Sequence, residues 1–376
     1  MQTSVTRIHK FVPKTAYRRE FRTGVSLHSH TMHSKEFLGR LPTYIAKVPI
    51  GSYILEREIG RSHLYTGQIY DFSKFFWTPP LSPREAYQLE AKQIEEQLGL
   101  PAMVSLSDHD NIEAGIQLRM LNGMSQTPIS VEWTVPYEET EFHIGVHNLP
   151  AERAAEWANA LTECSDTDSG LYGLLADLHA EPELLLVLNH PYWDAESIGQ
   201  AAHRQLLKKF LTNFQPYLHA VEVNGMRSRR ENREVVALGN EMNLPVVAGG
   251  DRHGFEPNAV LNVSRAESFA GFVREIREER RSEIILMPQF FEPLQLRLLE
   301  NAWHAVAEAP GEFGRSHWMT RIFLIENGEA KALSQFTGTR FHRLIDKFRW
   351  WMALLASPAL RPALRLPFLG NEEGGL

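Results

Sequence analysis

Several histidines and carboxylates in this chain have spacings that suit metal binding. His28 and His30 are two residues apart, and Asp251 and His253 repeat that spacing. Residues i and i+2 of an extended chain point to the same side, so both members of a pair can reach one ion. Further side chains of the same types lie between the two pairs: Asp108, His109, Asp110, Glu132, His143 and His190. Together they predict a metal centre.

Each pair alone is weak evidence, because most histidine pairs of this kind are ordinary surface or core residues. The joint pattern is stronger, since apolar runs precede four of the metal-type motifs. These runs are residues 25–27, 104–106, 185–188 and 246–248. We interpret them as buried strands, and active sites of parallel α/β folds gather at the carboxyl ends of such strands.

The mixture of donors indicates which ions the centre would take. Imidazole and carboxylate ligands suit zinc, manganese or iron better than calcium or magnesium alone. The candidates are too many for one four-coordinate ion, so two or three divalent transition metals sharing a bridging carboxylate are the simplest arrangement. Such a centre lowers the pKa of a bound water and holds phosphoryl oxygens. The expected chemistry is therefore metal-assisted hydrolysis.

Strand and helix patterns alternate along most of the chain. The expected strands are residues 24–27, 103–106, 129–134, 141–146, 184–188, 221–223, 245–248 and 284–287. One helix should begin at Ser82, with Pro83 and Glu85 completing its capping signal, and stop at Gly99. Others are expected at residues 151–162, 203–214, 228–242 and 266–279. This alternation predicts an α/β fold with a largely parallel sheet.

Two segments interrupt the alternation. Residues 38–80 form an insertion rich in aromatic residues, including Phe72, Phe75, Phe76 and Trp77. Long loops are often lids or binding elements, and a packed insertion is the alternative. Residues 289–376 are expected to be mostly helical, with basic and aromatic residues interleaved over 340–365. That helix would pack on the barrel or on a second subunit, giving a homo-oligomer, or lie on a membrane surface.

Composition bounds the class of protein. The chain has 376 residues, of which 43% are hydrophobic, and a formal net charge of -7. The hydrophobic share predicts a folded core, and the acidic balance disfavours a stable nucleic-acid partner. Cys164 is the single cysteine and fits a reducing compartment. We expect no signal peptide and no transmembrane segment, hence a cytoplasmic location.

The motifs resemble those of the PHP (polymerase and histidinol phosphatase) family, in the family's order. They are Leu27-His28-Ser29-His30-Thr31, Ser107-Asp108-His109-Asp110, Val131-Glu132, Phe142-His143, Asn189-His190-Pro191 and Gly249-Gly250-Asp251-Arg252-His253. The resemblance covers roughly residues 25–287. It implies a distorted (βα)7 TIM-like barrel over residues 1–288 with a trinuclear centre. The insertion at 38–80 and a C-terminal extension from 289 would be additions to that barrel.

The resemblance also implies which residues bind which ion. One ion would take the first histidine pair, His28 and His30, with Glu132 and Asp251. A second ion would share Glu132 as a bridge. Its further ligands would be His143 and His190.

The third ion would take His109 and His253 with one more ligand from the first loop. Many relatives carry an acidic residue or histidine seven or eight positions after the first histidine, and here that stretch reads Lys35-Glu36. Glu36 is the candidate and His33 the second choice. If Lys35 points inward instead, the third site would be weak, and the lysine could contact a phosphate.

The resemblance favours a phosphoesterase in which metal-bound hydroxide attacks a phosphate ester. The catalytic candidates are Asp108, Glu132, His190 and Asp251. Asp108 and Asp110 are expected to orient imidazoles rather than bind ions.

Basic residues are candidates for binding the substrate's phosphate. Arg227, Arg229 and Arg230 follow the strand at 221–223, and Lys35 joins them as a substrate-binding candidate. The alternative for the arginines is a solvated helix terminus. We expect a small phosphorylated substrate, such as a nucleotide, a sugar or amino-alcohol phosphate, or an oligonucleotide end.

Two other functions stay open. One is C–N bond hydrolysis of the amidohydrolase type, which usually needs a bridging modified lysine or another ligand order, and the sequence shows neither. The other is a non-catalytic module, since some PHP domains attached to polymerases are structural. The nearly complete ligand set argues against that role.

Overall fold

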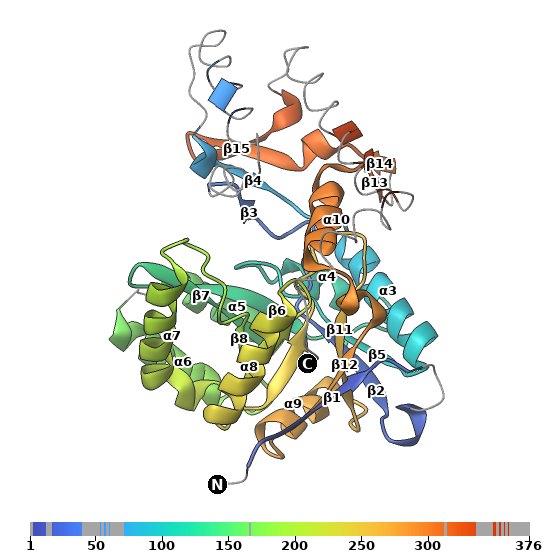
Figure 1. Ribbon diagram of the computed structural model, residues 1–376, viewed down its shortest axis with the longest axis vertical. Helices are drawn as coiled ribbons and strands as arrows, with labels where there is room; N and C mark the ends of the chain where they lie inside the picture. The colour runs from blue at the N-terminus through green and yellow to red at the C-terminus, as the bar shows by residue number, and fades with distance from the viewer. Residues whose placement is uncertain are drawn as a thin grey trace.

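Two five-stranded sheets form the body of the protein (Figure 1). The computed structural model describes residues 3–12, 17–39, 71–164, 167–311 and 314–335, with a few isolated positions elsewhere. The first sheet contains, in spatial order, β1 (Val5–Lys10), β12 (Arg281–Leu286), β11 (Val260–Ser264), β2 (Thr23–Leu27) and β5 (Ala102–Ser105). The second contains β10 (Val246–Gly249), β9 (Ala220–Asn224), β8 (Leu185–Asn189), β7 (Thr140–Leu149) and β6 (Ile129–Tyr137).

Strand directions are mixed, which corrects the expected largely parallel sheet. β2 pairs with β5 in parallel, as does β9 with β8 and β10, whereas β7 and β11 run antiparallel to both of their neighbours. Only Glu138 and Glu139 separate β6 from β7. Two residues can close a hairpin, but a parallel crossover needs a dozen or more. The chain therefore reverses at this point.

The two sheets are linked by isolated bridges and do not close through regular ladders. Beyond β2 and β10, Ser29 pairs with Arg252, and beyond β5, His109 pairs with Glu132 of β6. At the first seam the Asp251 amide donates to the His28 carbonyl at 2.7 Å. Both seams thus fall on the predicted metal-type residues.

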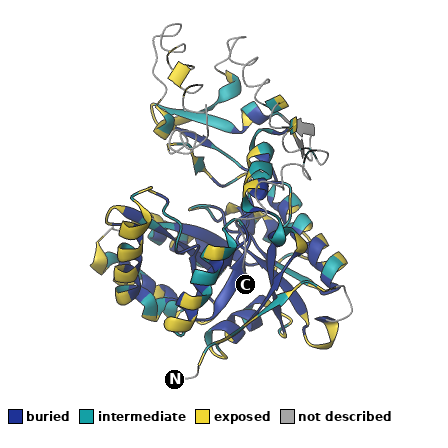
Figure 2. Cartoon of the chain, in the orientation of Figure 1, coloured by how far each residue is buried: buried dark blue, intermediate teal, exposed yellow. Residues whose placement is uncertain are grey.

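The five expected helices are present, and they lie outside the sheets. They are α3 (Pro83–Gln93), α5 (Ala154–Glu163), α7 (Gln200–Phe214), α8 (Arg229–Glu241) and α9 (Phe269–Arg277). The capping box of Ser82 and Glu85 is formed, and the helical path ends at Gly99, whose φ is 69°. Figure 2 shows most strands of the two large sheets buried and the outer helix faces exposed. Two further helices, α4 (Glu113–Arg119) and α6 (Asp168–Ala180), were not expected.

The described part of the C-terminal segment contains strands as well as the expected helix, and most of residues 336–376 lies outside the described residues. One helix, α10 (Leu294–Val306), is followed by four strands: β13 (Ala309–Gly311), β14 (Gly314–Ser316), β15 (Ile322–Glu326) and β16 (Glu329–Ala332). Asn327 and Gly328, both with positive φ, join β15 to β16. Asn-Gly between apolar segments is a strong hairpin signal, and it explains why this segment pairs as strands.

A small sheet joins the insertion to the C-terminal segment. Its order is β16-β15-β4-β3, where β3 is Glu36–Phe37 and β4 is Phe75–Trp77. We call it the cap sheet, and Figure 1 shows it above the two larger sheets. Phe75 and Phe76 are buried in it, so this part of the insertion packs. Most of residues 40–70 and 336–376 lies outside the described residues, so the lid role and most of the basic and aromatic stretch stay predictions.

No helix in the described part of the chain is both long enough and apolar enough to cross a membrane.

Candidate metal centre

Glu132 lies at the centre of a buried cluster of imidazoles. It is carried by β6, and its side chain is fully buried. Its Oε2 atom lies 2.9 Å from His28 Nε2, 3.3 Å from His30 Nε2 and 3.4 Å from His109 Nε2. Its Oε1 atom lies 3.2 Å from His143 Nδ1 and 3.1 Å from His190 Nε2. A carboxylate placed between two sets of imidazoles has the geometry of a bridging ligand.

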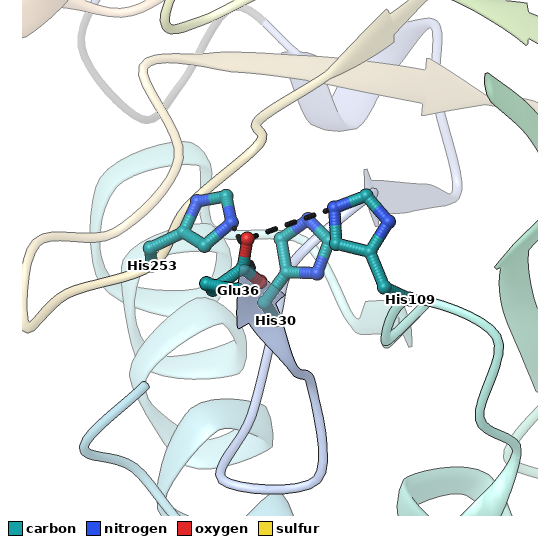
Figure 3. A group of neighbouring side chains, drawn as sticks. All are labelled: His30, Glu36, His109 and His253. Carbon is teal, nitrogen blue, oxygen red and sulfur yellow. Dashed lines mark ion pairs between the residues drawn. The ribbon is translucent and has the colours of Figure 1, made fainter. Parts of the chain in front are cut away.

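A second carboxylate, Glu36 of β3, lies between two further histidines (Figure 3). Its Oε1 atom is 3.1 Å from His253 Nε2, and its Oε2 atom is 3.7 Å from His109 Nε2. The ring of His30 stacks on both imidazoles, with centroids 4.1 Å from His253 and 4.9 Å from His109. Of the two candidates for the last ligand of the third ion, Glu36 and His33, it is Glu36 that lies beside His109 and His253.

Donor atoms converge in three overlapping groups. Within each group they lie within 4.8 Å of one another. The groups are His28, His30 and Glu132; His109, Glu132 and His143; and His30, Glu36, His109 and His253. We call the last one the Glu36 group. The overlap differs from the expected partition, because His109 belongs to two groups.

Asp251 lies between the first group and the Glu36 group. Its Oδ1 atom is 3.8 Å from His28 Nε2, 3.6 Å from His30 Nε2 and 3.5 Å from His253 Nδ1. The carboxylate can thus serve either group. Each ligand expected from the sequence lies in this one cluster.

The buried donor atoms fit divalent transition metals. His28 Nε2, His30 Nε2, His143 Nδ1 and Glu132 Oε2 are buried and make no hydrogen bond. Buried polar atoms in folded proteins almost always have a partner. Four such atoms that converge, all of nitrogen or carboxylate type, match the ligand preferences of zinc, manganese or iron.

The backbone is bent at three of these residues. His28, His190 and Asp251 have φ values of 60°, 27° and 54°, in the region that non-glycine residues rarely adopt. Such conformations cost about 1–3 kcal/mol each and cluster at functional sites. They turn the three side chains out of the strand direction and into the cluster.

The histidines of the cluster differ in protonation state, which bears on metal binding. Burial opposes the charge on Glu132, but the surrounding histidines outweigh it and hold its pKa well below the usual range. Burial lowers the pKa of His109 to about 4 and that of His190 to about 3, so both are neutral near pH 7. Neighbouring carboxylates outweigh burial at His30 and His143, raising their pKa to about 9 and about 10. Bound ions would displace those protons.

Sequence reasoning missed Glu222, which lies behind His28. Its Oε2 atom is 2.7 Å from His28 Nδ1, and its Oε1 atom accepts a hydrogen bond from Asn224 at 2.7 Å. A carboxylate behind a metal-binding imidazole fixes the ring's orientation and tautomer. The available signal was an acidic residue inside the apolar strand predicted at 221–223.

Asp108 and Asp110 differ from expectation. Asp108 accepts hydrogen bonds from the amide and hydroxyl of Thr31, at 2.5 and 2.7 Å, and Asp110 accepts one from the Thr134 amide at 2.9 Å. Among the described residues these hydrogen bonds fix loops, and none goes to an imidazole. The placement of Asp108 supports a positioning role and does not support a catalytic one.

Arg227 is the one predicted arginine that reaches the cluster. Its Nη2 atom lies 3.4 Å from Asp251 Oδ2, and its guanidinium lies 4.6 Å from the ring centroid of Trp193. The Trp193 ring also contacts the rings of His143 and His190 edge-on. Arg227 Nε is buried and lies 3.8 Å from Glu231 Oε1, so carboxylates flank the guanidinium on two sides.

The other basic candidates lie away from the cluster. Arg230 is largely exposed and pairs with Glu234 on α8, and the guanidinium of Arg229 lies 5.8 Å from the Phe291 ring centroid. Lys35 is exposed, with Nζ 5.8 Å from the Phe76 ring centroid. Arg230 is 83% exposed on α8 and so does not support its assignment to substrate binding, whereas that assignment of Arg229 stays a prediction. Lys35 does not point inward.

Comparison with solved structures gives several distant matches, including the following two. PsfC from Pseudomonas syringae shares 14% identity at a TM-score of 0.36, covering 76% of this chain and 98% of that chain. A protein from Bifidobacterium adolescentis, provisionally named a metal-dependent phosphoesterase, shares 13% identity at a TM-score of 0.31. The match covers 66% of this chain and 91% of that chain. No family model and no curated protein matches the chain. At these scores neither structure carries a conclusion about activity.

Proposed function

We propose that this protein is a metal-dependent hydrolase that cleaves phosphate esters. The observation that carries the proposal is the convergence on Glu132 of buried imidazole nitrogens, several of which make no hydrogen bond. Buried polar atoms without a hydrogen bond often mark the place of an ordered water or an ion. Arg227 adds a cation at the edge of the same cluster, which favours an anionic substrate.

The residues have distinct roles in this proposal. His28, His30, Glu132 and Asp251 would hold one ion. The group of His109, Glu132 and His143 would hold a second, and the Glu36 group a third. When bound, the ions supply a lowered pKa for water and charge stabilisation for a phosphoryl group. Arg227 would donate hydrogen bonds to the phosphate oxygens, since guanidinium pairs well with phosphate. The Trp193 ring packs beside His143 and His190 and shields that side from water.

We also propose that seven strands correspond to the distorted barrel that the resemblance implies. In spatial order they are β2, β5, β6, β7, β8, β9 and β10. The support is the pair of seams, where isolated bridges link β5 to β6 and β10 to β2. The remaining strands, β11, β12 and β1, extend the sheet beyond β2.

A phosphate-release screen tests the proposed activity. The purified protein, loaded with manganese or zinc, is assayed on a panel of phosphomonoesters and phosphodiesters, with amide substrates in parallel. We expect turnover of at least one phosphate ester and none of the amides. Hydrolysis of amides alone would move the assignment to C–N bond hydrolysis. No turnover with a full complement of metal would favour a non-catalytic module.

An arginine pair tests the anion site. Arg227→Ala removes charge-assisted hydrogen bonds worth about 1.5–3 kcal/mol, so KM for the preferred ester should rise about 10- to 100-fold. Arg230→Ala is the matched control, because Arg230 is largely exposed and directed away from the cluster. Equal KM values in the two variants would contradict the role of Arg227.

A further inference from the structure

Glu36 is held in place by the C-terminal part of the chain. It pairs with Trp77 of β4, and Trp77 pairs in turn with Ile322 of β15. β3 has only two residues, too few to be stable without neighbouring strands. The register of the cap sheet therefore fixes the backbone that carries Glu36, whose Oε1 atom also accepts a hydrogen bond from the Ser34 hydroxyl at 2.6 Å.

Two contacts fix β4 against the C-terminal segment. The Thr78 amide donates to the Arg321 carbonyl at 2.9 Å. The ring of Phe76 stacks on that of Phe323, with centroids 4.9 Å apart and planes at 12°. Since β4 lies between β3 and β15, a shift of β15 would be passed to Glu36.

His253, the ligand opposite Glu36, is supported by α10. The residues after it, Gly254 and Phe255, pack on His304 of α10. The Phe255 amide donates to His304 Nδ1 at 3.3 Å, and the two rings are edge-on with centroids 4.9 Å apart. A Cβ atom at Gly254 would lie 2.4 Å from His304 Nδ1 and 2.9 Å from its Cβ. This close approach requires glycine and fixes the loop that carries His253.

A buried arginine ties the two supports together. Arg321, which directly precedes β15, is only 5% exposed. Its guanidinium donates to the carbonyls of His304, at 3.5 Å, and of Ala307, just after α10. The helix behind His253 and the strand behind Glu36 therefore behave as one unit.

We propose that α10 and β15 together are the positioning element of the Glu36 group. Glu36 and His253 are the two members of that group that belong to no other, and both are supported by the C-terminal segment. The other two groups use residues of β6 and β7 and of the loops after β2 and β5. The C-terminal segment would thus set the occupancy of one ion without affecting the others. This inference rests on the metal centre proposed above.

Ion-by-ion affinity tests this role. The full-length protein, stripped of metal, is titrated with manganese alone and with zinc alone. We expect three equivalents in the unaltered protein. His304→Ala should weaken the affinity for one equivalent by about tenfold or more, in the range of lost supporting contacts at metal sites, and leave two unchanged. His304→Asn should restore it, because the amide oxygen can accept the Phe255 hydrogen bond.

Two further variants separate positioning from general damage. Leu298→Ala changes an exposed side chain of α10 and should leave all three affinities unchanged. Gly254→Ala forces His304 and the His253 loop apart and should weaken the same single equivalent, even if His304→Ala fails to fold. Thermal denaturation of the metal-free proteins checks that each variant is folded.

Three results would overturn the inference. They are unchanged affinities in His304→Ala and Gly254→Ala, equal weakening of every equivalent, and an unaltered protein that binds only two ions. The last result would leave the proposed function intact. An unaltered protein that binds less than one ion would contradict the proposed function itself.

Discussion

Removing the carboxylate behind His28 should weaken metal binding although that carboxylate is not a predicted ligand. Glu222 is 1% exposed, and its Oε2 atom lies 2.7 Å from His28 Nδ1. In Glu222→Ala the imidazole loses the partner that fixes its orientation. Losses of this kind typically lower metal affinity about 10- to 100-fold, which corresponds to about 1.4–2.7 kcal/mol.

The same substitution should also lower the free energy of unfolding. The Asn224 side chain loses the acceptor that it holds at 2.7 Å, and an unsatisfied buried donor costs about 1–3 kcal/mol. Affinity is measured by competition with a chromophoric chelator, and stability by urea unfolding of the metal-free protein. Glu222→Gln keeps the shape of the side chain and loses its charge. Its metal affinity should therefore lie between those of the unaltered protein and Glu222→Ala.

A second buried carboxylate provides the control. Glu283 of β12 is buried and lies 2.8 Å from His9 Nε2, outside the metal cluster. Glu283→Ala should lower stability and leave metal affinity unchanged. If Glu222→Ala binds metal as tightly as the unaltered protein, or if Glu283→Ala weakens binding as much, the reasoning about His28 is refuted.

Three other predictions concern buried ionisable side chains. Glu132→Gln should remove metal and turnover together, and elemental analysis that finds full metal content with near-normal activity would exclude a bridging role. Glu90→Ala leaves the buried Arg252 guanidinium without the carboxylate 2.9 Å from its Nε atom. The free energy of unfolding, measured with urea, should fall by about 3–5 kcal/mol. A fall below about 1 kcal/mol would contradict this prediction. Burial, with Arg277 nearby, holds the pKa of His219 well below its usual value. As the pH falls below about 6.5, His219 therefore becomes protonated in the unfolded chain but stays neutral in the folded protein. Stability of the metal-free protein should therefore fall by up to about 1.4 kcal/mol per pH unit as the pH drops, and His219→Gln should flatten that slope, whereas an unchanged slope would count against it.

Much of the fold could be predicted from local signals in the sequence. The Ser82 and Glu85 capping box and the end at Gly99 follow from backbone hydrogen bonding within one helix, and such short-range effects are legible in sequence. The metal-type residues were also legible, because each follows or lies within a predicted strand. The two seams bring the residues after β2, β5 and β10 close to Glu132, and the pairing of β7 with β8 adds His143 and His190.

Features that depend on contacts between distant parts of the chain could not be predicted in the same way. The pairing of β15 with β4 depends on which strands meet, and no spacing specifies that. The positive φ values of His28 and Asp251 are imposed by the surrounding structure. Glu222 was missed since its partner lies 194 positions away. Asn327-Gly328 was a readable hairpin signal that the expectation of a helical segment overlooked.

The metal content of the purified protein tests the central claim most directly. Protein prepared without chelators is analysed for bound elements, then again after incubation with manganese, zinc or iron and removal of free ions. The buried donors around Glu132 and Glu36 predict two or three equivalents per chain. Fewer than one equivalent, with no gain on adding any of the three metals, would contradict the account.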